Sequence, residues 1–155
     1  MIQRIQTLYL LLTILTSGLF LTGSFLEFRN DTGELIKITF MGIYRSVGGN
    51  GFELTLKLIP MTVLILLIPL LSAVTVFLYK KRKLQIKAAS VIIVIAIVLI
   101  ILTVYYVFIV ISRFKVDLVM TIKMFLPVVI MLFAILAFRA IKKDEDLVRS
   151  YDRLR

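Results

Sequence analysis

Long runs of apolar residues, separated by charged stretches, dominate the chain. Three runs without any charged residue cover residues 5–26, 58–79 and 88–112. A fourth run, residues 119–141, is interrupted only by Lys123 and Arg139, which stand close to its ends. Each run is long enough for a helix that rises about 1.5 Å per residue to cross about 30 Å of hydrocarbon. The pattern therefore predicts four membrane-spanning helices.

Small residues and prolines inside the runs predict how these helices pack. Helices associate in lipid by close approach, so small side chains mark the expected contacts. These residues are Thr13, Ser17, Gly18, Thr22, Ser72, Ala73, Ala134, Ala137 and Ala140. Pro60 suits the first turn of a helix, whereas Pro69 and Pro127 lie inside runs and are expected to kink them.

Residues 27–57 form the longest segment between two apolar runs. Apolar and polar residues alternate without a break at 52–57, which predicts a half-buried strand, and more loosely at 35–41. Turn-forming residues occupy 30–33 and 48–51. We expect a small β-hairpin or a three-stranded meander that includes residues 25–29. It is interpreted either as a cap over the helices or as a surface that binds a ligand or partner.

The composition supports a membrane protein and excludes several kinds of chemistry. Of the 155 residues, 61% are hydrophobic and 18% are charged, whereas a soluble domain is nearer one half and one quarter. The chain has no Cys and no His. Disulfides, thiolate chemistry, histidine acid–base catalysis and the usual zinc, copper and haem ligands are therefore excluded. We expect no catalytic residues, no cofactor and no metal.

The first run has an alternative interpretation as a cleaved signal peptide. Its only charged residue upstream is Arg4, and no Ala-x-Ala sequence follows the run. The run is also longer than the apolar core of a typical signal peptide. A membrane span is the favoured interpretation.

The distribution of the net charge of +10 predicts the orientation in the membrane. If both termini lie in the cytoplasm, that side holds 12 Lys and Arg residues and the outside holds 7. The positive-inside rule favours this orientation. The charges border apolar runs rather than covering a soluble face, so nucleic acid is not an expected partner.

Most of this asymmetry comes from the connection between the second and third runs. It contains five basic residues and no acidic residue: Lys80, Lys81, Arg82, Lys83 and Lys87. These are candidate contacts for anionic lipid headgroups. The alternative is that they act only as a topology signal.

The last residues, 142–155, form a charged tail with a helical pattern. Leu147, Tyr151 and Leu154 recur at i, i+4 and i+7, which places them in one stripe of a helix. One interpretation is a helix that continues the fourth span or lies along the headgroups. The other is a helix that docks into a partner's groove. The candidate docking residues are Leu147, Val148, Tyr151, Leu154, Arg149 and Arg153.

Three segments resemble a known family. They are residues 1–10 (MIQRIQTLYL), 78–85 (LYKKRKLQ), and 141–150 (IKKDEDLVRS) with 152–155 (DRLR). They are similar to a family of small four-span membrane proteins of Bacteroidota that is classed as a domain of unknown function. The resemblance covers essentially the whole chain and implies a bacterial inner-membrane location. It implies no activity.

Together these observations predict an all-α membrane protein. It is expected to be an up-down four-helix transmembrane bundle, with a small β-hairpin or meander in the first extracytoplasmic loop, and a single domain over residues 1–155. The expected function is a non-enzymatic accessory or scaffold subunit of the bacterial inner membrane, with lipid or protein partners at its tail. A small oligomeric transporter or channel is the main alternative, and an intramembrane enzyme acting on lipid is a third.

Overall fold

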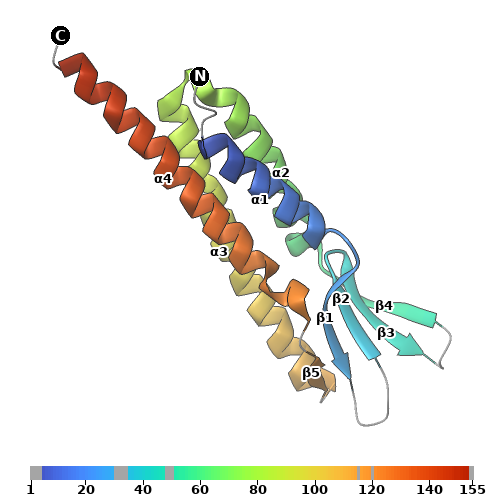
Figure 1. Cartoon of the computed structure of the whole chain (residues 1–155). Coiled ribbons are helices and arrows are strands. Elements are labelled where there is room, and N and C mark those ends of the chain that lie inside the picture. Colours follow the sequence, from blue (N-terminus) through green and yellow to red (C-terminus); the bar gives the residue numbers. More distant parts are fainter. Residues whose placement is uncertain (1–4, 30–34, 48–50, 115, 120, 154–155) are drawn as a thin grey trace.

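The computed structural model in Figure 1 combines helices and a sheet, and it describes residues 5–29, 35–47, 51–114, 116–119 and 121–153. Four α-helices pack side by side, and the sheet lies at one end of them. The helices are α1 (Ile5–Phe20), α2 (Ile59–Phe77), α3 (Arg82–Phe114) and α4 (Leu126–Arg153). Short 3-10 helices, η1 (Leu78–Lys80) and η2 (Ile122–Phe125), precede α3 and α4. The strands are β1 (Ser24–Arg29), β2 (Leu35–Thr39), β3 (Gly42–Val47), β4 (Gly51–Lys57) and β5 (Asp117–Val119).

The prediction of an all-α protein with only a small hairpin is wrong. The described chain forms a five-stranded antiparallel sheet in the order β4-β3-β2-β1-β5, in addition to the helices. β1 uses the last residues of the first apolar run, so α1 ends earlier than that run does. β5 comes from the connection after α3 and pairs with β1, with Phe28 opposite Leu118. The sheet therefore pairs the connection after α1 with the connection after α3, a contact that the sequence pattern did not predict.

One face of the sheet packs against the helices and the other carries charges. Leu26 and Phe28 of β1, with Ile36 and Ile38 of β2, are buried. Between them on the opposite face, Glu27 is paired with Lys37 at 3.9 Å between Oε1 and Nζ. This alternation is the usual pattern of an antiparallel sheet with one covered face.

Strand β4 was predicted correctly as a strand but not as a half-buried one. Every residue from Gly51 to Lys57 is exposed, including the three apolar ones, Phe52, Leu54 and Leu56. β4 is the edge strand farthest from β5 in the sheet order, so no neighbour covers its outer side. The alternation of apolar and polar residues along β4 therefore predicted the strand but not the exposure of its apolar side chains.

Inside the helical layer, small and polar side chains are buried together with large apolar ones. α1 contacts α2 and α4, and α3 contacts the same two helices. The predicted contact residues Thr13, Ser17, Ser72, Ala134 and Ala137 are all buried. Gly18 and Thr22 differ from the prediction, because a Cβ on Gly18 would meet nothing within 4 Å and Thr22 is exposed.

The predictions for the three prolines also agree with the structure only in part. Pro60 stands in the first turn of α2 and Pro69 lies inside that helix, as expected. Pro127 is the second residue of α4, after η2, so the prediction that it kinks the interior of a helix is wrong. Proline is well tolerated at this position, where its missing N–H costs no helical hydrogen bond.

Hydrogen bonds fix the helix ends to the sheet. After α1 the chain turns at Gly23, with φ of 69°, and the Nζ of Lys123 donates to the carbonyl oxygen of Thr22 at 2.7 Å. Lys123 thus satisfies a carbonyl at the end of α1, where a cation also suits the helix dipole. At the start of α2, Thr62 Oγ1 donates to the carbonyl oxygen of Phe40 at 2.6 Å.

Three helical segments are long and apolar enough to cross a membrane, by length and composition, within the part of the chain that the structure describes. They are Ile59–Phe77, Arg82–Phe114 and Ile122–Val148. α1 is also apolar but has 16 residues.

Gly42 gives a test of the contact between β3 and β4. A Cβ at this position would meet Leu54 and would lie 2.6 Å from the carbonyl oxygen of Leu56. We expect Gly42→Ala to lower the free energy of unfolding by about 1–3 kcal/mol, because a backbone oxygen must move to relieve the overlap. Gly51→Ala is the matched control, since a Cβ there meets nothing within 4 Å. Denaturant unfolding in detergent measures both, and equal stabilities of the two variants would contradict this account.

Candidate functional site

The basic connection between the second and third runs is mostly helical. α2 ends at Phe77, η1 follows, and α3 begins at Arg82, so Arg82, Lys83 and Lys87 lie in the first two turns of α3. Lys81 accepts hydrogen bonds at its carbonyl from the amides of Leu84 and Gln85, at 2.9 and 3.0 Å. Cations at a helix N-terminus are disfavoured by the helix dipole. These charges therefore do not stabilise the start of α3.

The predicted tail is part of α4. This helix is continuous from Leu126 to Arg153 and extends past the ends of the other helices in Figure 1. Of the candidate docking residues, Leu147 is 50% exposed and Val148 is 39% exposed. The side chains of Arg149, Tyr151 and Arg153, and all of Leu154, lie outside the described part of the chain. The structure shows the tail as a continuation of the last helix, and docking of that helix into a partner stays a prediction.

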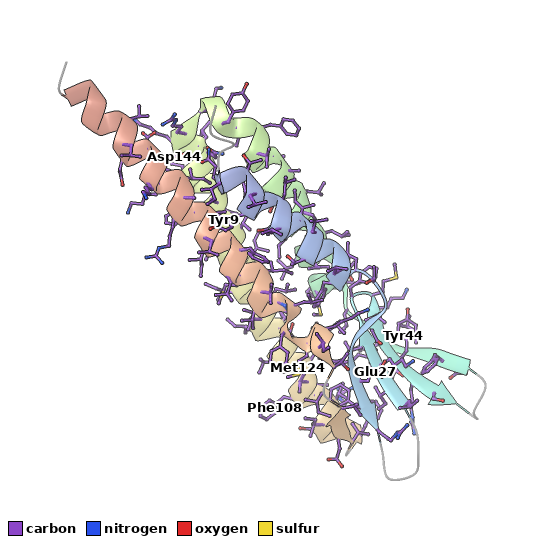
Figure 2. All side chains as sticks on the ribbon, viewed as in Figure 1. Tyr9, Glu27, Tyr44, Phe108, Met124 and Asp144 are labelled. Carbon is purple, nitrogen blue, oxygen red and sulfur yellow. The ribbon has the colours of Figure 1, made fainter. Side chains whose placement is uncertain are left out.

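Arg82 joins the basic connection to the tail. Its Nη1 donates to the carbonyl oxygen of Asp144 at 3.0 Å, across 62 residues of sequence. Asp144 stands near the upper end of α4 in Figure 2, well away from the sheet. The structure therefore brings together two candidate regions that the sequence treated as independent. A main-chain acceptor leaves no signal in a sequence pattern.

Two open hollows lie beside this contact. One, of about 410 Å³, is lined by Lys81, Arg82, Lys83, Leu84 and Glu145. The other, of about 560 Å³, is lined by Phe138, Arg139, Lys142, Lys143, Asp146 and Leu147. Cations outnumber carboxylates in both, so each suits an anionic group such as a phosphate. In the sequence, Arg139, Lys142 and Lys143 counted only toward the predicted orientation and were not predicted to line a site.

The basic residues of the connection and of the two hollows, which have no lining residue in common, are together called the basic surface. It comprises Lys81, Arg82, Lys83, Lys87, Arg139, Lys142 and Lys143. The side chain of Lys80, the remaining predicted lipid contact, is not among the described ones. The basic surface lies at the end of the helices opposite the sheet, where α1 begins and α2 ends (Figure 1).

Polar side chains are also buried between the helices. Gln85 donates from Nε2 to the carbonyl oxygen of Thr75 at 3.1 Å. The Oε1 atoms of Gln6 and Gln85 and the Oγ of Ser72 are buried without a hydrogen-bond partner. Gln6 lies in the first apolar run and Gln85 in the basic connection, and neither was predicted to be buried. No group of three acidic residues within the described ranges is placed to hold a metal ion.

Comparison with known proteins identifies the family. The chain belongs to the family described as "Domain of unknown function (DUF4293)", whose model matches residues 2–154. The predicted resemblance to a family of unknown function is confirmed at that level. No curated protein and no solved structure matches the chain.

The Arg82–Asp144 contact predicts a coupling between the basic connection and the tail. Arg82→Gln removes the guanidinium that holds the carbonyl of Asp144. Hydrogen bonds from charged donors contribute about 1.5–3 kcal/mol, and the partial exposure of Arg82 reduces this to about 1 kcal/mol. We expect amides in residues 142–153 to exchange with deuterium about fivefold faster. Lys83→Gln makes the same charge change at an exposed neighbour and serves as the control. Equal exchange rates in the two variants would show that the contact does not hold the tail.

Proposed function

We propose that the chain is a multi-pass protein of the bacterial inner membrane, with both termini in the cytoplasm. In this proposal it is a non-enzymatic accessory or scaffold subunit that presents the basic surface and the end of α4 to anionic lipid and to a protein partner. Its placement in bacteria, among the Bacteroidota, is supported by the three segments that resemble the four-span family. The observation that carries the proposal is the reversed polarity of α1.

α1 buries three of its polar residues and exposes four of its six leucines. Gln6, Thr13 and Ser17 are buried, whereas Leu8, Leu15 and Leu19 are each more than half exposed. A surface helix of a water-soluble protein has the opposite arrangement. If lipid surrounds α1, its exposed leucines face hydrocarbon and its buried polar groups are shielded from the lipid. This argument applies to α1 although that helix is shorter than the other three.

Charge supports the proposed orientation. α1 begins and α4 ends at the same end of the helical layer, beside the basic surface (Figure 1). Twelve of the 19 Lys and Arg residues belong to the segments at that end, counting the two termini. The positive-inside rule favours the cytoplasm for this end, and the sheet then lies outside.

Because the chain has no cysteine, single cysteines can map this topology. We expect a membrane-impermeant maleimide to label Glu53→Cys, in exposed strand β4, in intact spheroplasts. Lys83→Cys, on the basic surface, is expected to be labelled only after lysis. Leu15→Cys is expected to resist labelling in both, because lipid covers it. Labelling of Lys83→Cys in intact spheroplasts would reverse the orientation, and rapid labelling of all three after lysis would contradict the membrane placement of α1.

The exposed end of α4 supports the scaffold role. Leu147 and Val148 are exposed on the part of α4 that passes beyond its neighbours. Apolar side chains on a projecting helix suit a groove in a partner or the headgroup region of the bilayer. The acidic residues Asp144, Glu145 and Asp146 precede them, and residues 147–155 contain three arginines and one aspartate.

Truncation after Asp146 tests the scaffold role. This variant keeps Asp144, and hence the acceptor of the Arg82 hydrogen bond, but loses the candidate docking residues. We expect proteins that co-purify with the full chain from native membranes to be at least tenfold depleted with the truncated chain. Mass spectrometry of crosslinked, detergent-solubilised complexes measures this. Arg29→Gln, an exposed position at the end of β1 outside both the removed segment and the basic surface, is the control. An unchanged partner set would show that the tail does not dock.

A small oligomeric transporter or channel is a second candidate. The observation that favours it is the set of buried polar atoms without partners on Gln6, Ser72 and Gln85. Unpaired polar atoms between helices are costly unless water or a solute meets them. Solute flux into liposomes that contain the purified chain distinguishes this candidate from the scaffold.

A further inference from the structure

Strand β4 and the turn between β2 and β3 expose apolar side chains beside the start of α2. Leu54, Leu56 and Met41 are 43%, 39% and 56% exposed, and Ile59, the first residue of α2, is 64% exposed. The main chain holds these positions together, because the amide of Leu58 donates to the carbonyl oxygen of Met41 at 2.9 Å. We call Met41, Leu54, Leu56 and Ile59 the apolar edge. It continues the exposed apolar surface of α2 onto the sheet.

An irregularity in the sheet turns the leucines of β4 to both sides. β4 pairs with β3, with Leu54 opposite Tyr44 and Leu56 opposite Ile43, so Thr55 is an extra residue between the two pairs. Neighbouring residues of a strand face opposite sides, and paired residues share a side. Leu54 and Leu56 therefore project from opposite sides of the sheet. A protein surface that covered one side would leave the other leucine exposed, whereas lipid reaches both.

The same irregularity disfavours pairing of β4 with a strand from a second copy. β4 is an edge strand, and edge strands invite such pairing unless a bulge interrupts their row of main-chain groups. The main-chain groups on the outer side of β4 still need hydrogen-bond partners, which hydrocarbon does not offer. The headgroup layer of a bilayer offers water and lipid oxygens to the main chain and an apolar boundary to the leucines.

The lengths of two helices place the lipid boundary near β4. α2 and α3 are joined by a short connection, so they can be compared from that end. α2 has 19 residues and α3 has 33, so α3 reaches about 20 Å farther toward the sheet. Val104, Phe108 and Ile111 are exposed on this extension, and the next charged residue is Arg113. β4 joins α2 at its start and lies in the interval between these two limits (Figure 1).

Charged residues bracket the apolar edge. Lys57 is exposed at the end of β4, where the long side chain of a lysine can reach lipid phosphates. Glu53 is exposed directly before Leu54. The ring of Phe52 lies under the Nζ of Lys37, 4.6 Å from it, and so belongs to the charged side of the sheet. The strand therefore changes from apolar to charged surroundings at Glu53.

We propose that the apolar edge rests in the headgroup layer of the leaflet on the sheet side. Met41, Leu54 and Leu56 then lie against the boundary of the acyl chains, and Lys57 lies at the lipid phosphates. Residues 51–53 stay in water. This inference rests on the proposed membrane location. It makes β4 a strand that contacts lipid, at the end of the helices opposite the basic surface.

Because the chain has no tryptophan, single tryptophans can report contact with lipid. Each variant is reconstituted into phosphatidylcholine vesicles, with or without bromine near the glycerol end of the acyl chains, because bromine quenches only nearby indole rings. We expect Leu56→Trp to be quenched about as strongly as Val63→Trp, at an exposed position of α2, and Leu54→Trp about half as strongly. Phe52→Trp is the matched control on the same strand, and Arg29→Trp, at the exposed end of β1, is the control in water. Both are expected to lose less than about a tenth of their fluorescence.

Quenching of Leu56→Trp and Leu54→Trp no stronger than that of Arg29→Trp would overturn the proposal. The emission of Leu56→Trp then shows what covers the edge. Emission at the wavelength of Arg29→Trp indicates water. Emission at a shorter wavelength that changes with the ratio of protein to lipid indicates a second copy. Either result excludes lipid. If Leu56→Trp does not elute as a folded species, Met41→Trp replaces it with the same expectation.

Val63→Trp keeps this test separate from the proposed function. Quenching of Val63→Trp without quenching of Leu56→Trp would remove only the lipid contact of the apolar edge. Failure of bromine to quench Val63→Trp would remove the membrane location itself.

Discussion

The helices pack closely because small and polar side chains are interspersed with large apolar ones where the helices meet, and this packing positions the rest of the molecule. Thr13 and Ser17 on α1 donate their hydroxyls to the carbonyl oxygens of Tyr9 and Ile14, both at 2.9 Å. Because these hydroxyls are satisfied within their own helix, they leave a flat surface. α4, which packs against α1, offers Ala134 and Ala137. On α1, Leu8, Leu15 and Leu19 face outwards, whereas Leu10 and Phe20 are buried beside the small residues.

Among the described residues, the sheet buries large apolar side chains without the small polar ones that accompany them between the helices. Phe28, Ile36 and Ile38 form a core of large apolar side chains, as in a water-soluble domain. The two regions meet where Phe20, the last residue of α1, stacks on Phe25 of β1 with ring centroids 4.5 Å apart. The Lys123–Thr22 bond lies at the same junction. An aromatic contact and a capped helix end therefore join the helices to the sheet.

The sequence predicts the parts of this structure that depend on local pattern. Apolar runs locate the four helices, and alternation locates β4. The sheet as a whole could not be predicted, because β3 lacks a regular alternation and β5 has only three residues, Asp117–Val119. Both become strands through pairing with distant segments, which tertiary contacts decide rather than local preference. The same limit applies to the basic surface, since Arg82 meets a main-chain oxygen of Asp144 whose position no side-chain pattern records.

The length of α3 connects the two ends of the molecule. Its 33 residues span about 50 Å, against about 30 Å of hydrocarbon in a bilayer, whereas α1 has 16 residues and α2 has 19. The excess at its start carries Arg82 and Lys83 of the basic surface. The excess at its end carries Val110, which is buried, and Phe114, whose ring lies 5.8 Å from the Cζ of Arg45 on β3. One helix therefore supplies basic residues at one end of the molecule and packs against the sheet at the other.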